Sequence, residues 1–139
     1  MIGDEVIQAA IITKLKSLSP YGNVSQTEIK EWEWQGDSFT YPNIRVELED
    51  NRFEFDEQAK CSLQYTEFSV YIFSEQRSSK ECSQIKTLVA NSMIGVGFSN
   101  QTLGVRFSEI RVVDNVPAIR QDERTWRSQI KLSSRVSPI

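Results

Sequence analysis

The stretch LQYTEFSVYIFS, residues 63–74, decides the fold of this 139-residue chain. Its two alternating sets of positions are both rich in β-branched and aromatic residues, with Val70 and Ile72 in one set and Tyr71 and Phe73 in the other. This pattern is typical of a strand that is covered on both faces. We therefore predict that residues 63–74 form the central strand of a sheet.

A helix is predicted directly after this strand. Ser78-Ser79-Lys80-Glu81 places a hydroxyl three residues before a carboxylate, so each side chain can bond one unpaired N–H group of a helix start. Gly95 can end the helix in a left-handed conformation. The helix should pack on the sheet through apolar residues at helical spacing: Cys82, Ile85, Leu88, Val89 and Met93.

Residues 4–18 are predicted to form an earlier helix. Asp4 can cap its start, and Ser19-Pro20 with the following Tyr21-Gly22 ends it. The chain start has acidic residues and no basic segment or long apolar run, so we expect no signal peptide and no membrane-spanning segment, and hence synthesis in a cytoplasm. The apolar face of this helix contains Ile7, Ala10, Ile11, Leu15 and Leu18.

Three strands are predicted between the two helices. Residues 24–33 alternate loosely, and Tyr41-Pro42 forces an extended approach to residues 43–49, a clearly half-buried strand. Asp50 and Asn51 are expected to make a turn. Residues 53–55 then form the returning arm of the hairpin and lead, through Glu57 and Gln58, into the central strand.

Two more strands are predicted after the second helix. Residues 103–113 change parity near Ser108 and Glu109, which indicates a bulge. Residues 114–122 lack periodicity and are expected to be an extended hairpin loop before a closing strand that starts at Trp126. The loop would carry apolar side chains into solvent, which contact with a partner subunit would explain: Val116, Ala118 and Ile119.

These elements predict an α+β fold in the order helix, three strands, helix, two strands. The sheet should be mainly antiparallel or mixed, with the two helices packed on one face. At 139 residues, the chain has the length of a single domain spanning residues 1–139.

The composition argues against an enzyme. The chain has no histidine, so it lacks the commonest general base and metal ligand. Cys61 and Cys82 have no nearby partner ligands and are interpreted as reduced, partly buried packing residues, with a redox or disulfide role as the alternative. No glycine loop for phosphate is present, because Gly95 and Gly97 end a helix instead of starting one. We predict no catalytic residue, no cofactor and no metal site.

Charge is unevenly divided along the chain. Residues 1–75 hold 14 acidic and 6 basic residues, net −8, and residues 76–139 hold 5 and 10, net +5, giving −3 in all. This division suits a subunit whose acidic side meets the basic side of the next copy, or two differently charged solvated faces. Sequence-specific nucleic-acid binding is not expected, but diffuse contact with a DNA backbone stays open for Arg106, Arg111, Arg120, Arg124, Arg127, Lys131 and Arg135.

Two further features are candidate contact surfaces. Trp32 and Trp34 would point the same way on an extended chain and could stack on a ligand or form an exposed patch; half-buried packing under a loop is the alternative. The region 47–57 is rich in carboxylates that would lie about 7 Å apart along a strand, without the spacing of a calcium loop. A solvated or partner-facing edge is therefore favoured over a metal site for Glu47, Glu49, Asp50, Glu54, Asp56 and Glu57.

Several passages together carry a family resemblance. They are the N-terminal helix, WEWQGDSFTYPNIRVELED at residues 32–50, the strand and helix YTEFSVYIFSEQRSSKECSQIKTLVANSM at residues 65–93, and WRSQIKLSSRV at residues 126–136. In these passages the chain resembles the tail terminator, or tail completion, proteins of long-tailed bacteriophages. The similarity runs over most of the length and lies in patterns of shape.

This resemblance implies a small structural subunit of the virion tail and neck, assembled in the host cytoplasm as a hexameric ring with no membrane contact. Such a ring caps the head-proximal end of the tail tube, ends tube polymerisation and meets the neck or connector proteins, while DNA passes through its lumen. The 114–124 loop and the acidic segment 47–57 would then be intersubunit or tube-facing surfaces, with Glu47, Glu49, Asp50, Glu54, Asp56, Val116, Pro117, Ile119, Arg120 and Arg124 as candidate interface residues.

Two alternatives stay open. Another neck or baseplate component, such as a head-tail connector subunit, has a similar size and composition. A compact cytoplasmic ligand-binding or enzymatic domain would be favoured if Trp32 and Trp34 lined a closed pocket with convergent polar groups.

Overall fold

The computed structural model describes residues 1–34, 40–56 and 61–139, and for residues 54–56 and 61–63 it describes the backbone alone. The fold is α+β, with four strands after the second helix where two were predicted. The described elements are α1 (Asp4–Leu18), a short 3₁₀ helix (Gln26–Glu28), β1 (Ile29–Glu31), β2 (Asn43–Asp56), β3 (Cys61–Ser74), α2 (Lys80–Met93), β4 (Phe98–Asn100), β5 (Val105–Phe107), β6 (Arg111–Arg120) and β7 (Trp126–Pro138).

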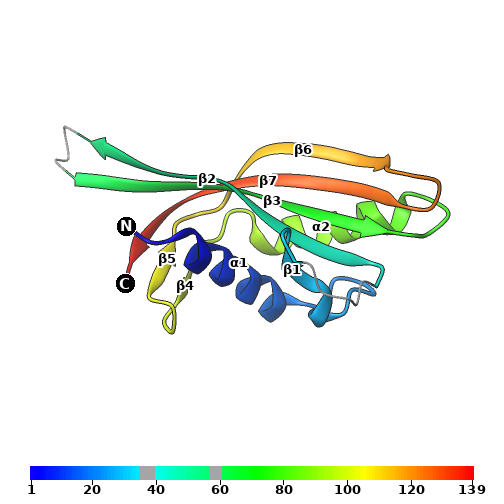
Figure 1. The fold of residues 1–139 in the computed structure, drawn as a ribbon, viewed down its shortest axis with the longest axis horizontal. Coiled ribbons are helices and arrows are strands. Elements are labelled where there is room, and N and C mark those ends of the chain that lie inside the picture. Colours follow the sequence, from blue (N-terminus) through cyan, green and yellow to red (C-terminus); the bar gives the residue numbers. More distant parts are fainter. Residues whose placement is uncertain (35–39, 57–60) are drawn as a thin grey trace.

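The strand predicted to be central is central. The sheet has the order β1-β2-β3-β7-β5-β4, and β6 also pairs with β7 (Figure 1). β3 pairs antiparallel with β2 on one side and with β7 on the other, from Gln64 opposite Val136 to Ser74 opposite Trp126. Because β1 runs parallel to β2, the sheet is mixed.

One buried cluster joins the helices to the sheet. The register places alternate residues of β2, β3 and β7 on the same face, and these side chains pack with α1 and α2. Leu88 was predicted to lie in this cluster and is instead 44% exposed, because it lies outside the stripe of α2 that faces the strands. The fully buried members include Ile7, Ile11, Ile44, Val46, Phe68, Val70, Ile72, Ile85, Val89 and Leu132.

The predicted helix caps form only in part. Gly3, not Asp4, is the N-cap of α1, and Asp4 lies in the first turn, where it accepts a hydrogen bond from Asn51. At α2, the Ser78 hydroxyl accepts a 3.4 Å hydrogen bond from the Lys80 N–H, whereas Glu81 turns to other partners. Gly95 has the predicted left-handed conformation, with φ +81°, just after α2.

The predicted turn at Asp50 and Asn51 is wrong. β2 continues through both residues to Asp56, which pairs with Cys61 at the start of β3. A register shift separates Leu48, opposite Phe68, from Asp50, opposite Glu67, so the strand absorbs one extra residue as a bulge and does not reverse. Residues 53–55 therefore belong to β2, and the predicted approach through residues 57 and 58 lies outside the described residues.

The bulge predicted near Ser108 is confirmed, but the strand around it is divided. Phe107 of β5 pairs with Val136, and Arg111 of β6 pairs with Ser133. The chain from β5 to β6 thus advances four residues while β7 advances three, which leaves one extra residue on the β5–β6 side. The region predicted to be a loop, residues 114–122, is strand as far as Arg120, because β7 offers a continuous edge with which it can pair.

Candidate interaction surfaces

β6 is an exposed edge strand that carries apolar side chains. It pairs with β7 on one side, and no described strand pairs with its other side. Val112, Val113 and Ile119 are 46%, 45% and 42% exposed. Pro117 is also exposed, whereas Val116 and Ala118, which were predicted to reach solvent, are half-buried.

The turn between β6 and β7 is held by its own hydrogen bonds. The Asp122 carboxylate accepts hydrogen bonds from the N–H groups of Arg124 and Thr125, both at 2.8 Å, and these bonds lower the pKa of Asp122. The Arg120 guanidinium donates to the carbonyls of Asp122 and Glu123. The turn therefore presents the exposed residue Arg124 from an ordered backbone.

β2 has a second free edge. β1 pairs with β2 only along Ile29–Glu31, opposite Ile44 to Val46, so from residue 47 to residue 56 no described strand borders the outer side of β2. Phe53, which is 50% exposed, lies in this segment. The N-terminal segment hydrogen-bonds to this part of β2 where the Asn51 amide donates to the Ile2 carbonyl and the Asp4 carboxylate.

Carboxylates near this edge bind side chains across the outer face of the sheet. Glu49 bridges Lys131 at 2.7 Å and accepts a 2.6 Å hydrogen bond from Ser69, and Lys131 also reaches Glu67 at 3.3 Å. Burial raises the pKa of Glu49, but the hydrogen bonds from Lys131 and Ser69 outweigh it and the pKa is lowered overall. These carboxylates are therefore compensated within the chain, and the described residues hold no group of three or more that could bind a metal ion.

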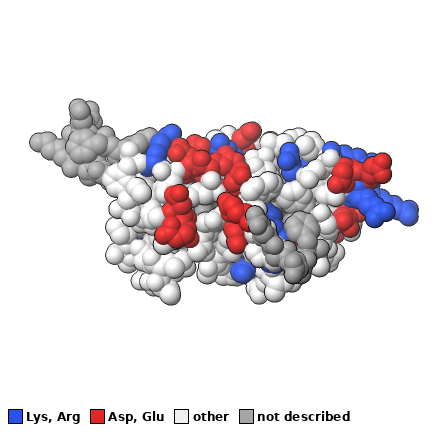
Figure 2. Space-filling model, viewed as in Figure 1, with Lys and Arg blue, Asp and Glu red and all other residues white. Residues whose placement is uncertain are grey.

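The other predicted acidic residues are arranged differently. Glu47 accepts a 3.2 Å hydrogen bond from the Tyr71 hydroxyl, and Asp50 pairs with Arg52 at 3.1 Å. Glu54 and Asp56 are described as backbone only, and Glu57 lies outside the described residues. Figure 2 shows acidic side chains over the left and centre of the molecule and a group of basic side chains, mixed with some acidic ones, at the right-hand end, where the β6–β7 turn lies.

The two tryptophans contact different side chains. The chain turns at Trp32 and is not extended there, since the Trp34 N–H donates to the Glu31 carbonyl at 3.2 Å. The Trp32 ring lies 4.5 Å from the ring of Tyr71 and remains 40% exposed, and the Trp34 ring lies 3.2 Å from the Lys30 ammonium. The chain is not extended here, so the alternation on which the predicted alignment relied is absent. Both rings nevertheless lie at one face of the sheet, because Trp34 is also 5.7 Å from the Arg45 guanidinium and Arg45 pairs with Tyr71 across β2 and β3.

A buried ion pair under this region escaped the sequence analysis. Arg45 was expected on the solvated face of its strand, but it is 3% exposed and donates to the Glu28 carboxylate at 3.2 Å and to the Glu28 carbonyl at 2.6 Å. Burial raises the pKa of Glu28, yet the hydrogen bonds from Arg45 and Thr40 lower it overall. The parallel pairing of β1 with β2 creates this contact, and no local pattern reveals that pairing.

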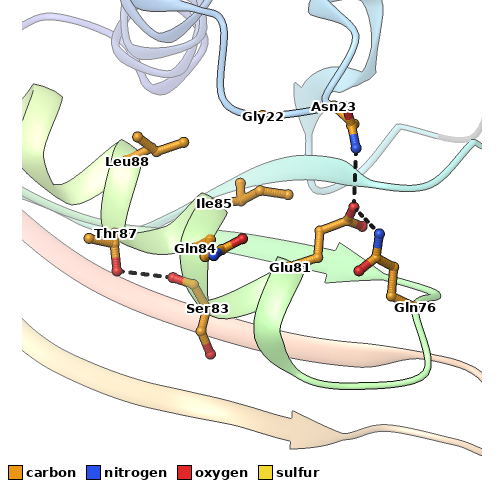
Figure 3. Close-up of a pocket in the computed structure, with 9 residues that line it drawn as sticks. All are labelled: Gly22, Asn23, Gln76, Glu81, Ser83, Gln84, Ile85, Thr87 and Leu88. Carbon is orange, nitrogen blue, oxygen red and sulfur yellow. Dashed lines mark hydrogen bonds between the residues drawn. The ribbon is translucent and has the colours of Figure 1, made fainter.

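A groove lies beside α2, and Figure 3 shows the residues that line it. Its volume, 580 Å³, is within the range of small-molecule sites. The Glu81 carboxylate in it already accepts hydrogen bonds from Ser74, Gln76 and Asn23, at 2.8, 2.7 and 3.5 Å. Its principal charged group is therefore satisfied by the chain itself. Neither tryptophan is among the lining residues.

Cys82 is a core residue, as predicted. Its thiol donates to the Ile72 carbonyl at 3.3 Å, and burial raises its pKa. The side chain of Cys61 lies outside the described part of the chain. None of the described helices is long and apolar enough to cross a bilayer.

The fold has a solved counterpart. A chain in the structure described as "Virion of native gene transfer agent (GTA) particle" is similar with a TM-score of 0.70 and 12% sequence identity, over 94% of this chain and 93% of that chain. At this identity the likeness shows a shared fold. No family model and no curated protein matches the sequence.

The likeness extends over most of the fold. Because 94% of this chain is covered, it is not restricted to the central strands of the sheet. The individual contact residues at the β2 and β6 edges are properties of this chain.

Proposed function

We propose that the protein is a virion structural protein that forms a hexameric ring at the head-proximal end of a phage tail tube. The ring ends tube polymerisation and joins the tail to the neck or connector proteins, and DNA passes through its lumen. The observation that carries this proposal is the likeness to a chain of a virion particle over 94% of this chain and 93% of that one. The resemblance to tail terminators narrows it to the end of the tube.

The surface of the subunit supports assembly with other copies. The β6 edge exposes Pro117 and Ile119, and the ordered turn beside it presents Arg120 and Arg124. The β2 edge holds acidic residues at the opposite side of the sheet. Two different complementary surfaces on one subunit produce head-to-tail contacts, and such contacts form a ring when the rotation between copies closes. We propose that the candidate interface residues on these two edges form the contact between neighbouring copies.

The role is non-enzymatic in this proposal, and the protein resides in the tail and neck of the virion after assembly in the host cytoplasm. The groove beside α2 supports this view, because Glu81 is engaged by neighbouring side chains. The proposed ring needs an open lumen and specific partners, which shape and charge supply without a catalytic group.

The test is a tube-capping assay with tail tubes from the virus that encodes the chain. Adding the purified protein should stop tube elongation and place a ring at one end of each tube in electron micrographs. The double variant Pro117→Asp with Ile119→Asp should keep its circular dichroism spectrum and lose capping, whereas Leu88→Asp, at an equally exposed site on α2, should cap normally.

Two results would contradict the proposal. Tubes that keep growing while the protein binds isolated necks or baseplates would identify another neck, connector or baseplate subunit. A protein that binds neither tubes nor necks, and remains a monomer by light scattering, would favour the ligand-binding alternative.

A further inference from the structure

We propose that neighbouring copies join by extending the sheet: the outer edge of β6 of one copy pairs antiparallel with the free edge of β2, residues 47–56, of the next copy. This inference rests on the homo-oligomer of the proposed function and goes beyond it by naming the two strands and the mode of contact.

Two unpaired strand edges of equal length carry the inference. β6 has 10 residues, and the part of β2 beyond its pairing with β1 runs from residue 47 to residue 56, also ten. Each edge presents backbone N–H and C=O groups without a partner strand in the described chain. Such edges bind added strands through backbone hydrogen bonds, and an edge left open invites aggregation. Pairing one edge with the other covers both.

The strand directions allow this pairing in a ring. β2, β3, β7 and β6 lie in that order, and each is antiparallel to the one before it, so β6 runs opposite to β2 (Figure 1). Copies related by rotation keep the same strand directions relative to the axis. The β2 strand of the next copy, placed beside β6, therefore continues the antiparallel alternation. The contact is heterologous, as a closed ring requires.

The side chains at the two edges are complementary. Residues 47–56 hold five acidic residues and one arginine, net −4, and β6 holds two arginines and one aspartate, net +1. Glu49 and Asp50 also have basic partners within the chain, so the complementarity lies in the net charge of the two edges. Opposite charges across paired strands stabilise the pair, and they also favour one register. Both edges expose apolar side chains that pairing would shield from water: Phe53 on β2, and Val112, Val113 and Ile119 on β6.

β6 also has features that restrict which strand it accepts. Pro117 lacks an N–H group, and the register against β7 shifts twice, between Val112 and Asp114 and between Val116 and Ile119. Proline and bulges on edge strands oppose indiscriminate pairing. A partner strand must match these irregularities, and β2 has a bulge of its own between Leu48 and Asp50.

The main rival is a symmetric pair of two β6 strands. An antiparallel β6–β6 pair that uses the whole strand places Arg111 of each copy opposite Arg120 of the other. Like charges directly opposite each other are destabilising. This rival also leaves the β2 edges uncovered, so charge and coverage both favour the β6–β2 contact.

The experiment uses one variant at each edge. Val112→Glu with Ile119→Glu places negative charge on β6, which should repel the acidic β2 edge. Asp50→Arg with Phe53→Arg places positive charge on β2, which should repel β6. The matched controls are Leu88→Glu and Val96→Arg, at sites 44% and 52% exposed on other surfaces. Circular dichroism checks that each variant folds.

Light scattering gives the masses, measured with and without tail tubes. The wild type and both controls should form rings, and each edge variant alone should be a monomer. An equimolar mixture of the two edge variants should form a heterodimer or a larger alternating assembly, because the intact β6 edge of one variant meets the intact β2 edge of the other, and the two altered edges carry opposite charges and do not repel each other. At least a doubling of mass on mixing is a readout that misfolding cannot produce.

The contrary results are distinct. If the β2 variant assembles as the wild type does, the β2 edge takes no part in the contact, and the proposal is wrong; if mixing gives neither a heterodimer nor a larger assembly, the proposal is also wrong. A wild type that stays monomeric with and without tubes overturns this inference. Heterodimer formation by a protein that fails to cap tubes would overturn the tail-end function and leave the strand pairing intact.

Discussion

β3 and β6 are both strands of one sheet, yet their surroundings are opposite. β3 has 14 residues and a strand on each side, and Phe68, Val70 and Ile72 on its inner face are all 0% exposed. β6 has 10 residues and one neighbour, and most of its side chains are exposed. The apolar residues of β3 are explained within the subunit. Those of β6 are not, and they indicate a contact outside it.

The largest expected effect is on the β3 side of this comparison. Phe68→Ala removes a fully buried ring and leaves a cavity against both neighbouring strands, so the free energy of unfolding should fall by about 3–5 kcal/mol. Urea denaturation followed by circular dichroism measures the loss. A decrease below about 1 kcal/mol would show that β3 is not the packed centre of the fold.

An intermediate loss of stability is expected at Glu28 and Arg45, where the outer face of the sheet is covered. Glu28→Gln should cost about 1.5–3 kcal/mol at neutral pH, because the buried guanidinium loses its charged partner. The pKa of Glu28 is lower in the folded than in the unfolded state, so its contribution is present above the ordinary value of 4.5 and is lost as pH falls through the folded pKa.

The same variant should therefore show a weaker decline of stability below pH 4.5 than the wild type. Urea denaturation at a series of pH values measures both slopes. Exposed Glu75→Gln is the control and should leave the wild-type slope unchanged. Identical slopes for the wild type and Glu28→Gln would refute a depressed pKa at this buried pair.

The smallest expected effect on stability is on β6. Ile119→Ser changes a side chain that is already 42% exposed, so the free energy of unfolding of the monomer should change by no more than about 0.5 kcal/mol. Chemical denaturation at low protein concentration measures this. A loss above about 2 kcal/mol would mean that Ile119 belongs to the subunit core, and the contrast between β3 and β6 would disappear.

The contrast also explains what the sequence could predict about the fold. β3, α1 and α2 bury a regular stripe, so hydrophobic periodicity identifies them. β6 buries little of its surface and has no periodicity, so residues 114–120 read as loop, although β7 holds them as strand. β4 and β5, at three residues each, are too short to give a pattern. In β2 the bulge hid the continuation, because Asp50 and Asn51 have turn composition.

The composition of the sequence predicted which residues make up the candidate surfaces, but it did not predict where those residues lie on the sheet. The surplus of apolar residues near Ile119 and of acidic residues near Glu49 was visible in the sequence. Their positions at opposite edges of one sheet depend on long-range pairing, which no local pattern encodes. For the same reason the partnership of Glu49 with Lys131, 82 positions later by residue number, was not foreseen.

The bulge in β2 changes the direction of the strand without changing the face on which the later side chains lie. With Glu49 as the extra residue, Leu48 and Asn51 both face the helices, and the strand still bends at this point. Removing Glu49 would leave the faces on both sides in place and straighten the strand. Deletion of this one residue would therefore change the direction of the β2–β3 hairpin and remove the ion pair with Lys131, while the residues beyond the bulge keep their faces.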